Sequence, residues 1–117
     1  MVAVKDICWL AGLLEGEGSF YTYTKKQLKN PTTYPELSVQ SNDEDVILRA
    51  SLLIGSRVSD VVPYNYSKLK SYKVRACSTK AIQWMMTIYP LMGIRRKAKI
   101  KEVITAWKTS TDGRKKK

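Results

Sequence analysis

The spacing of apolar residues predicts four helices in this chain. An apolar run predicts the first over residues 4–15. A second begins at a run of capping and acidic residues, 41–45, and continues with apolar positions at i, i+1, i+4, i+7 and i+8 until Gly55 ends it. Two more are expected over 79–89 and 95–108, with Pro90 and Gly93 breaking the chain between them.

Strand-forming residues predict four strands between these helices. β-branched and aromatic residues gather over 19–27, 34–40, 57–62 and 69–77, with turn residues separating the members of each pair. The expected order is therefore αββαββα followed by a terminal helix. This order predicts an α+β fold with two antiparallel hairpins.

Length and charge limit what the protein can be. With 117 residues the chain is expected to form one domain, over 1–111, followed by a disordered basic tail at 112–117. Lysine and arginine number 21 against 10 acids, a formal net charge of +11, which favours a nucleic acid as partner. The sequence shows no membrane span and no signal peptide, so we expect an intracellular protein, cytoplasmic or organellar, that is not secreted.

The cysteine and histidine content narrows the chemistry. Cys8 and Cys77 lie far apart in the sequence and are expected to be reduced thiols in the core. The chain has no histidine, which excludes histidine-dependent catalysis. Hydrolysis would have to rely on carboxylates, metal ions and basic side chains.

The end of the first predicted helix carries an unusual pattern, Leu-Ala-Gly-Leu-Leu-Glu-Gly-Glu-Gly over residues 10–18. Acids are disfavoured at a helix C-terminus, so Glu15 and Glu17 there need a compensating positive charge, and a divalent metal ion is one candidate. Gly16 and Gly18 are expected to end the helix in the left-handed conformation. Gly12 and Gly16 share one helical face, which would let a second helix approach closely.

This stretch resembles the LAGLIDADG motif of homing endonucleases. Relative to that motif, Glu15 and Glu17 stand in place of aspartates, Leu14 in place of isoleucine, and Gly16 in place of alanine. The predicted order of elements also matches one repeat of the family over most of the chain. The alternative reading is a buried amphipathic helix with an acidic, glycine-rich exit.

The resemblance implies a homodimer that cleaves double-stranded DNA at a long, pseudo-palindromic site. The antiparallel sheet would form a saddle on the DNA, with the motif helices at the dimer interface through Leu10, Gly12, Leu13 and Gly16. Glu17, with Gly16 beside it, would hold Mg²⁺ or another divalent cation such as Mn²⁺. Glu15 would be mainly structural.

The resemblance also implies further catalytic and DNA-contacting residues. A basic residue after the Pro-Leu-Met-Gly turn would assist phosphate chemistry, with Arg95 or Lys97 as candidates, and Ser41 or Asn42 would position water. Two-stranded ribbons fit the major groove. The strand residues expected to face DNA are Ser19, Tyr21, Tyr23, Lys25, Gln27, Ser38, Gln40, Lys68, Lys70, Lys73 and Arg75. Of these, Lys68 and Lys70 are expected at phosphates, and the tyrosines could instead pack against each other across strands.

A second function fits the same composition. Some LAGLIDADG proteins are RNA splicing maturases, and related domains occur in transcription regulators, so the chain could bind intron RNA or DNA without cleaving it. The net charge suits both functions equally. The acids Glu15 and Glu17 favour the enzyme, because a pure binder would gain from losing carboxylates beside phosphates.

Overall fold

The computed structural model describes residues 3–25, 32–61 and 71–115. The described part of the chain forms two compact units. The first takes Met1–Ser19 and Ser38–Ala76, and the second takes Phe20–Leu37 and Cys77–Lys117. The chain therefore crosses between the units within its strands.

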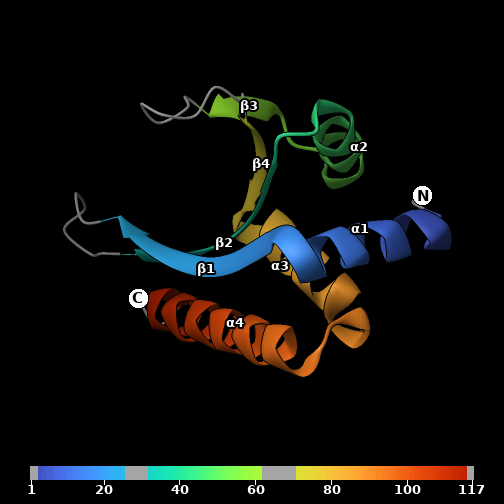
Figure 1. The fold of residues 1–117 in the computed structure, drawn as a ribbon. Helices are drawn as coiled ribbons and strands as arrows, with labels where there is room; N and C mark the ends of the chain where they lie inside the picture. Colours follow the sequence, from blue (N-terminus) through green and yellow to red (C-terminus); the bar gives the residue numbers. More distant parts are fainter. Residues whose placement is uncertain (1–2, 26–31, 62–70, 116–117) are drawn as a thin grey trace. The chain divides into compact units, whose positions relative to one another are not determined.

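The observed elements follow the predicted αββαββα order with a further helix at the C-terminus (Figure 1). They are α1 (Val4–Glu17), β1 (Gly18–Lys25), β2 (Thr32–Ser41), α2 (Glu44–Ile54), β3 (Val58–Val61), β4 (Ser71–Cys77), α3 (Ser78–Ile88), the 3₁₀ turn η1 (Tyr89–Leu91) and α4 (Ile94–Lys115). The α+β class is confirmed.

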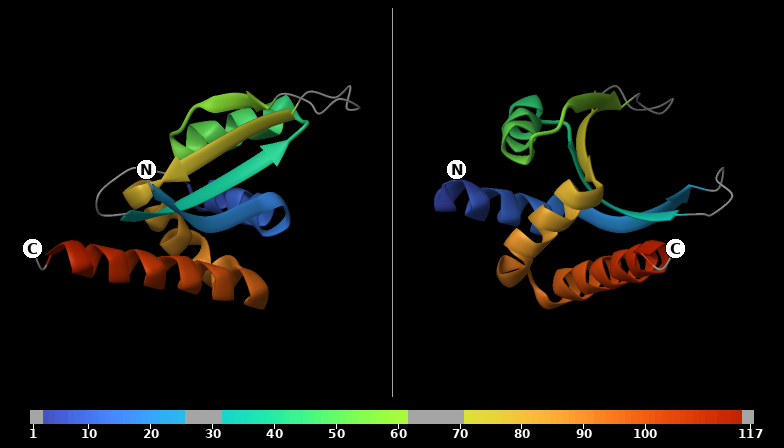
Figure 2. Two further views of the ribbon diagram at one scale, coloured as in Figure 1. Left: turned by 90° about the vertical axis from the view of Figure 1, so that its left-hand side faces the viewer. Right: turned by 180° about the vertical axis from the view of Figure 1, so that it is seen from behind.

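The four strands form one sheet in the order β1-β2-β4-β3. In the first unit β3 runs antiparallel to β4, with Val58 opposite Val74 and Ser59 opposite Lys73 (Figure 2). β2 takes part in both units, since its residues up to Leu37 belong to the second and its last four to the first.

The first unit is built around α1 and α2, which pack against each other. Leu10, Ala11 and Leu14 form the buried stripe of α1, at the i, i+1, i+4 spacing of one helical face. α2 supplies Ile47, Ala50 and Ile54 in the same way, while Val39, Val74 and Ala76 are buried apolar residues of the strands in this unit.

The second unit buries residues of the β1–β2 ribbon together with residues of α3 and α4. Phe20, Pro35 and Leu37 are buried apolar side chains of the ribbon. The helical positions are Ala81, Ile82, Met85 and Ile88 on α3, Met92 after η1, and Ile100 and Val103 on α4.

Several local predictions hold and several are wrong. Gly55 ends α2 in the left-handed conformation, at φ 83°, as expected. Gly16 lies inside α1, and Gly18 has φ −79°, so the left-handed ending predicted for α1 is wrong. α4 runs to Lys115, past the boundary expected at residue 111, so most of the expected disordered tail is helical.

The two cysteines differ in exposure. Cys8 is exposed and Cys77 is half-buried, so the expectation of a core position is wrong for Cys8. It lies on the outward face of α1, away from the buried stripe.

Among the described helices, none combines the length and the apolar character that crossing a membrane requires.

Candidate functional site

The C-terminus of α1 presents an exposed carboxylate directly before a strand. Glu17 is the last residue of the helix and is exposed, and Gly18 begins β1 (Figure 1). The last turn of α1 contains no basic residue. Because the final carbonyls of a helix point outward without intrahelical partners, this end gathers oxygen atoms that all carry negative charge.

Gly18 is required by close packing rather than by its backbone angle. A Cβ atom built on Gly18 would lie 2.6 Å from the carbonyl oxygen of Leu14 and 2.9 Å from its Cα. The Gly18 N–H also donates a hydrogen bond to that same oxygen. The strand therefore leaves the helix so tightly that only glycine fits, which fixes the position of Glu17 just before it.

The other two glycines of the motif face open space in the single chain. A Cβ atom on Gly12 or Gly16 would meet nothing within 4 Å, and both residues are exposed. Cys8 shares this face by helical spacing. Leu10 does not, because it is fully buried, so its side chain is not part of this open face, and its predicted place in a dimer interface stays a prediction. Leu13 is half-buried.

The basic residues at the start of α4 lie on three different stripes of the helix. Arg95 is exposed, and it shares the outward stripe with Lys99 and Glu102, which form an ion pair of 3.5 Å. The Lys97 ammonium lies 5.6 Å from the centre of the Tyr89 ring, a cation–π contact. No acid occupies the first turn of this helix.

Arg96, which the sequence pattern does not single out, lies on the same stripe as the buried residues of α4. It lies at i−4 from Ile100 and i−7 from Val103, the buried stripe of α4. Its guanidinium carbon lies 5.9 Å from the centre of the Phe20 ring in β1. Phe20 follows Glu17 by three residues in the chain. The helical period of the buried residues was the signal that could have identified Arg96.

Ser41 and Asn42 are engaged in the structure around the start of α2. The Ser41 hydroxyl accepts a hydrogen bond of 3.1 Å from the Asp43 backbone N–H. The Asn42 amide donates a hydrogen bond of 3.1 Å to the Ser71 hydroxyl at the start of β4. These bonds hold the turn between β2 and α2, and the proposed water-positioning role of either residue stays a prediction.

In the first unit, Lys73 and Arg75, which are expected to face DNA, alternate along β4 with buried residues. Val74 and Ala76 are buried, while Arg75 is exposed and Lys73 is half-buried. Gln40 and Ser19 are also exposed. Ser38 is buried, at 6% exposure, which contradicts its expected place on an open face. Residues 35–39 are all buried, and β2 has a neighbouring strand on each side in the strand order.

In the second unit, Tyr23, one of the two tyrosines predicted to face DNA, belongs to a cluster with Tyr34, Glu36 and Cys77. The Tyr23 ring stacks on Tyr34, with 5.5 Å between ring centres, as the cross-strand alternative anticipated. The Cys77 thiol donates a hydrogen bond of 3.2 Å to the buried Glu36 carboxylate. Burial raises the pKa of the Tyr23 hydroxyl, and the nearby Cys77 and Glu36 raise it further. Tyr21 is half-buried.

Three of the residues expected to contact DNA lie outside the described residues: Gln27, Lys68 and Lys70. Lys25 closes β1, as predicted for a strand residue. Their contacts with DNA stay predictions.

The donor chemistry at the end of α1 fits a hard divalent cation. A carboxylate and outward-facing carbonyl oxygens are the ligands that Mg²⁺ prefers. Over residues 3–25, 32–61 and 71–115, no group of three histidine, cysteine, aspartate or glutamate residues comes together in a metal-binding cluster. A metal site that uses Glu17 would need ligands beyond the described part of one chain.

Comparison with solved structures identifies the fold. The group I intron-encoded homing endonuclease I-CeuI, complexed with DNA, matches 90% of this chain and 55% of its own, with a TM-score of 0.66 and 19% identity. The LAGLIDADG meganuclease I-CpaMI, bound to uncleaved DNA, matches 92% of this chain and 37% of its own, with a TM-score of 0.68 and 15% identity.

For a third similar structure, the match spans a larger share of that protein's own chain. The archaeal intron-encoded homing endonuclease I-Vdi141I, complexed with DNA, matches 92% of this chain and 83% of its own, with a TM-score of 0.63 and 14% identity. The chain spans about half the length of I-CeuI. No protein-family model and no curated protein matches the chain. The chain has the fold of LAGLIDADG homing endonucleases.

Proposed function

We propose that this chain is a LAGLIDADG-type endonuclease that cleaves double-stranded DNA at a specific site, as a homodimer with divalent metal ions. The observation that carries the proposal is the exposed Glu17 at the end of α1, followed by a glycine that close packing requires. The fold and the net charge of +11 support DNA as the substrate.

The open face of α1 supports the homodimer. Gly12 and Gly16 leave backbone exposed on one helical face, and two interior glycines each cost about 1 kcal/mol of helix propensity. A second copy of α1 that packs there would use this face and would bring a second Glu17 beside the first. Two carboxylates, carbonyl oxygens and DNA phosphates would then supply the ligands that one chain lacks.

The roles of the side chains follow from their charge and position. Glu17 would hold Mg²⁺ or Mn²⁺ against a scissile phosphate. Such an ion supplies Lewis-acid stabilisation of the phosphate and lowers the pKa of water. Arg96 or a neighbouring base on α4 would stabilise charge that develops on the phosphate oxygens. The exposed residues Gln40 and Arg75 would contact the bases or the phosphates of DNA, and the guanidinium of Arg75 is suited to guanine.

The first experiment is cleavage of a randomised duplex library in Mg²⁺, with the cut ends sequenced. We expect staggered cuts at one pseudo-palindromic site. Glu17→Gln should lower the cleavage rate by about 10³-fold or more while DNA affinity is kept, because it removes a metal-ligand charge and little else. Glu44→Gln, an exposed acid in the first turn of α2, is the matched control and should cut at the normal rate.

Cleavage by Glu17→Gln at the normal rate would show that the site assignment is wrong. If well-folded protein cuts no DNA but binds intron RNA tightly without Mg²⁺, the chain is a non-cleaving nucleic-acid-binding protein of the maturase or regulator kind.

The homodimer has a separate test. Gly12→Leu should leave the single chain folded, because its Cβ meets open space, and should abolish the dimer by separating the two helices. Sedimentation equilibrium gives the mass of both variants. Ala98→Leu, at an exposed position of α4, is the matched control and should remain dimeric. A wild-type monomer in the presence of the cleaved DNA would contradict the homodimer.

A further inference from the structure

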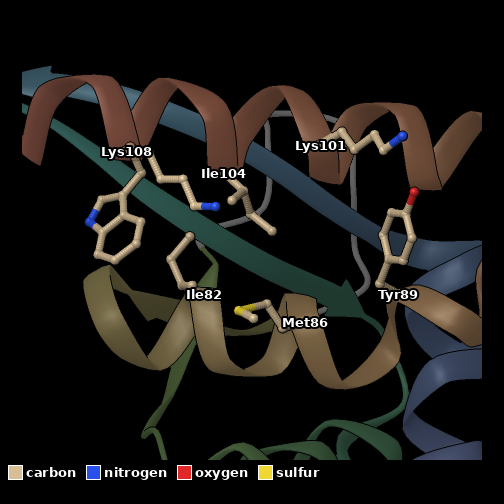
Figure 3. Close-up of a pocket in the computed structure, with 7 residues that line it drawn as sticks. Ile82, Met86, Tyr89, Lys101, Ile104 and Lys108 are labelled. Carbon is tan, nitrogen blue, oxygen red and sulfur yellow. The ribbon is translucent and has the colours of Figure 1, made fainter. Parts of the chain in front are cut away.

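A groove between α3 and α4 in the second unit plays no part in the proposed cleavage chemistry. Its volume is about 300 Å³. Figure 3 shows side chains from both helices and from η1 bordering it. The residues that line it are Ile82, Met86, Tyr89, Lys101, Ile104, Trp107 and Lys108.

The floor of the groove is apolar and open to solvent. Ile82 and Met86 lie on the α3 side and Ile104 on the α4 side (Figure 3). Met86 is 62% exposed, although methionine usually lies in the interior. A flexible thioether over an open apolar groove is suited to contacts with aliphatic side chains of another molecule.

Both charged residues of the groove are lysines, and none of its lining residues is acidic. Lys101 and Lys108 are separated by seven residues, about two helical turns or about 10.5 Å along α4. Figure 3 shows Lys101 at the end of the groove where Tyr89 points towards α4, and Lys108 farther along, beyond Ile104. The groove thus pairs an apolar strip with two positive charges along one wall.

We propose that this groove is a docking site for an amphipathic helix of a partner protein, with an aliphatic stripe and two acidic residues about two turns apart. Aliphatic side chains at i, i+4 and i+7 would fill the floor, and the acids would pair with Lys101 and Lys108. The charge of the groove selects an acidic partner. The floor residues Ile82, Met86 and Ile104 favour the apolar side chains of a peptide. Tyr89 and Trp107 also line the groove and offer rings for base stacking, so a nucleic acid is the outcome that the test must separate.

The test is a display library of helical peptides about 18 residues long, with the apolar and charged positions randomised. Selection uses the full chain, and counter-selection uses Met86→Glu, which replaces a mostly exposed side chain and so keeps the fold. We expect peptides with aliphatic residues at helical spacing and with Asp or Glu seven positions apart. Their affinity should fall about tenfold or more on Lys101→Glu with Lys108→Glu.

Matched variants separate this site from general charge attraction. Lys99→Glu changes the charge on the outward face of the same helix and should alter peptide affinity by less than about twofold. The proposal would be overturned if no selected peptide binds the wild type more tightly than Met86→Glu. It would also be overturned if Lys99→Glu lowers peptide affinity as much as Lys101→Glu with Lys108→Glu does. The third such outcome is that the groove variants lose affinity for RNA and not for the peptides. The last outcome would make the groove a nucleic-acid contact. All of these measurements are independent of DNA cleavage.

Discussion

Two helix ends in this protein carry charges of the sign that helices disfavour, and a third follows the ordinary rule. α1 ends in acids with no base in its last turn, and α4 begins with three bases and no acid in its first turn. α2 begins with Glu44 and Asp45, as helix electrostatics prefers. The chain therefore inverts helix charge at the two places where the proposed chemistry needs a cation and a phosphate.

The inversion has a physical cost that a ligand would remove. An unfavourable charge at a helix end costs about 0.3–1 kcal/mol at low ionic strength. A divalent cation at the end of α1 would neutralise Glu17, and a DNA phosphate at the start of α4 would neutralise its bases. The charges at the end of α1 and at the start of α4 therefore suit ligand binding, whereas the charges at the start of α2 stabilise the helix.

After Glu17, the largest effect on the cleavage rate is expected at Arg96. Arg96→Ala should lower the cleavage rate by about 10²-fold, the loss typical of one group that stabilises charge in the transition state. Arg95→Ala, on the exposed stripe, should change it by less than about threefold. Single-turnover cleavage with saturating enzyme measures both.

Two controls separate chemistry from folding for these variants. Thermal unfolding should show Arg96→Ala folded at the assay temperature, and Arg96→Lys should recover part of the rate because it keeps the charge. A larger loss in Arg95→Ala than in Arg96→Ala would assign the catalytic contact to the outward stripe.

The glycines of the motif should respond in opposite directions. Gly18→Ala should lower the free energy of unfolding by about 1–3 kcal/mol, because its Cβ would collide with the Leu14 backbone. Gly16→Ala should raise it by about 0.5–1 kcal/mol in the monomer, since alanine favours the helix and meets open space. Urea unfolding at low protein concentration measures both, and a shift of the same sign in the two variants would refute the packing argument.

The smallest effect tests the charge inversion itself. Glu17→Gln and Arg95→Gln should each raise the free energy of unfolding by about 0.3–1 kcal/mol at low salt, whereas Glu44→Gln should lower it by a similar amount. In about 1 M salt all three differences should shrink, because screening then acts over about 3 Å. If the three variants shift in one direction, helix electrostatics does not account for the pattern.

Local patterns were enough to predict the elements of this fold. The end of α2 at Gly55, the alternation along β4 and the order of helices and strands all depend on residues close together in the sequence. Helix ends were predicted less well: at its C-terminal end α1 runs two residues farther than expected, and α4 runs seven farther. Their final turns extend through residues such as Gly16 that disfavour helices when considered alone.

The candidate site was predicted in part, for a reason that particular residues show. Glu17 could be identified from the sequence because the motif is contiguous and its exposure follows from the helix ending there. The sequence left open which of the three consecutive bases lies beside Phe20, because that depends on how α4 packs. The burial of Leu10 and Ser38 was missed for the same reason, since fractional exposure depends on how the elements pack together.

The sequence by itself determined the order of elements, the acidic exit of α1 and the positive charge of the chain, because each follows from neighbouring residues or from composition. Only the tertiary structure decided that Gly18 is held by packing against Leu14, that Arg96 reaches Phe20, and that Lys101 and Lys108 border an apolar groove. The physical reason is that side-chain contacts depend on where the backbone places each residue in space, and helical or strand periodicity alone leaves those positions open.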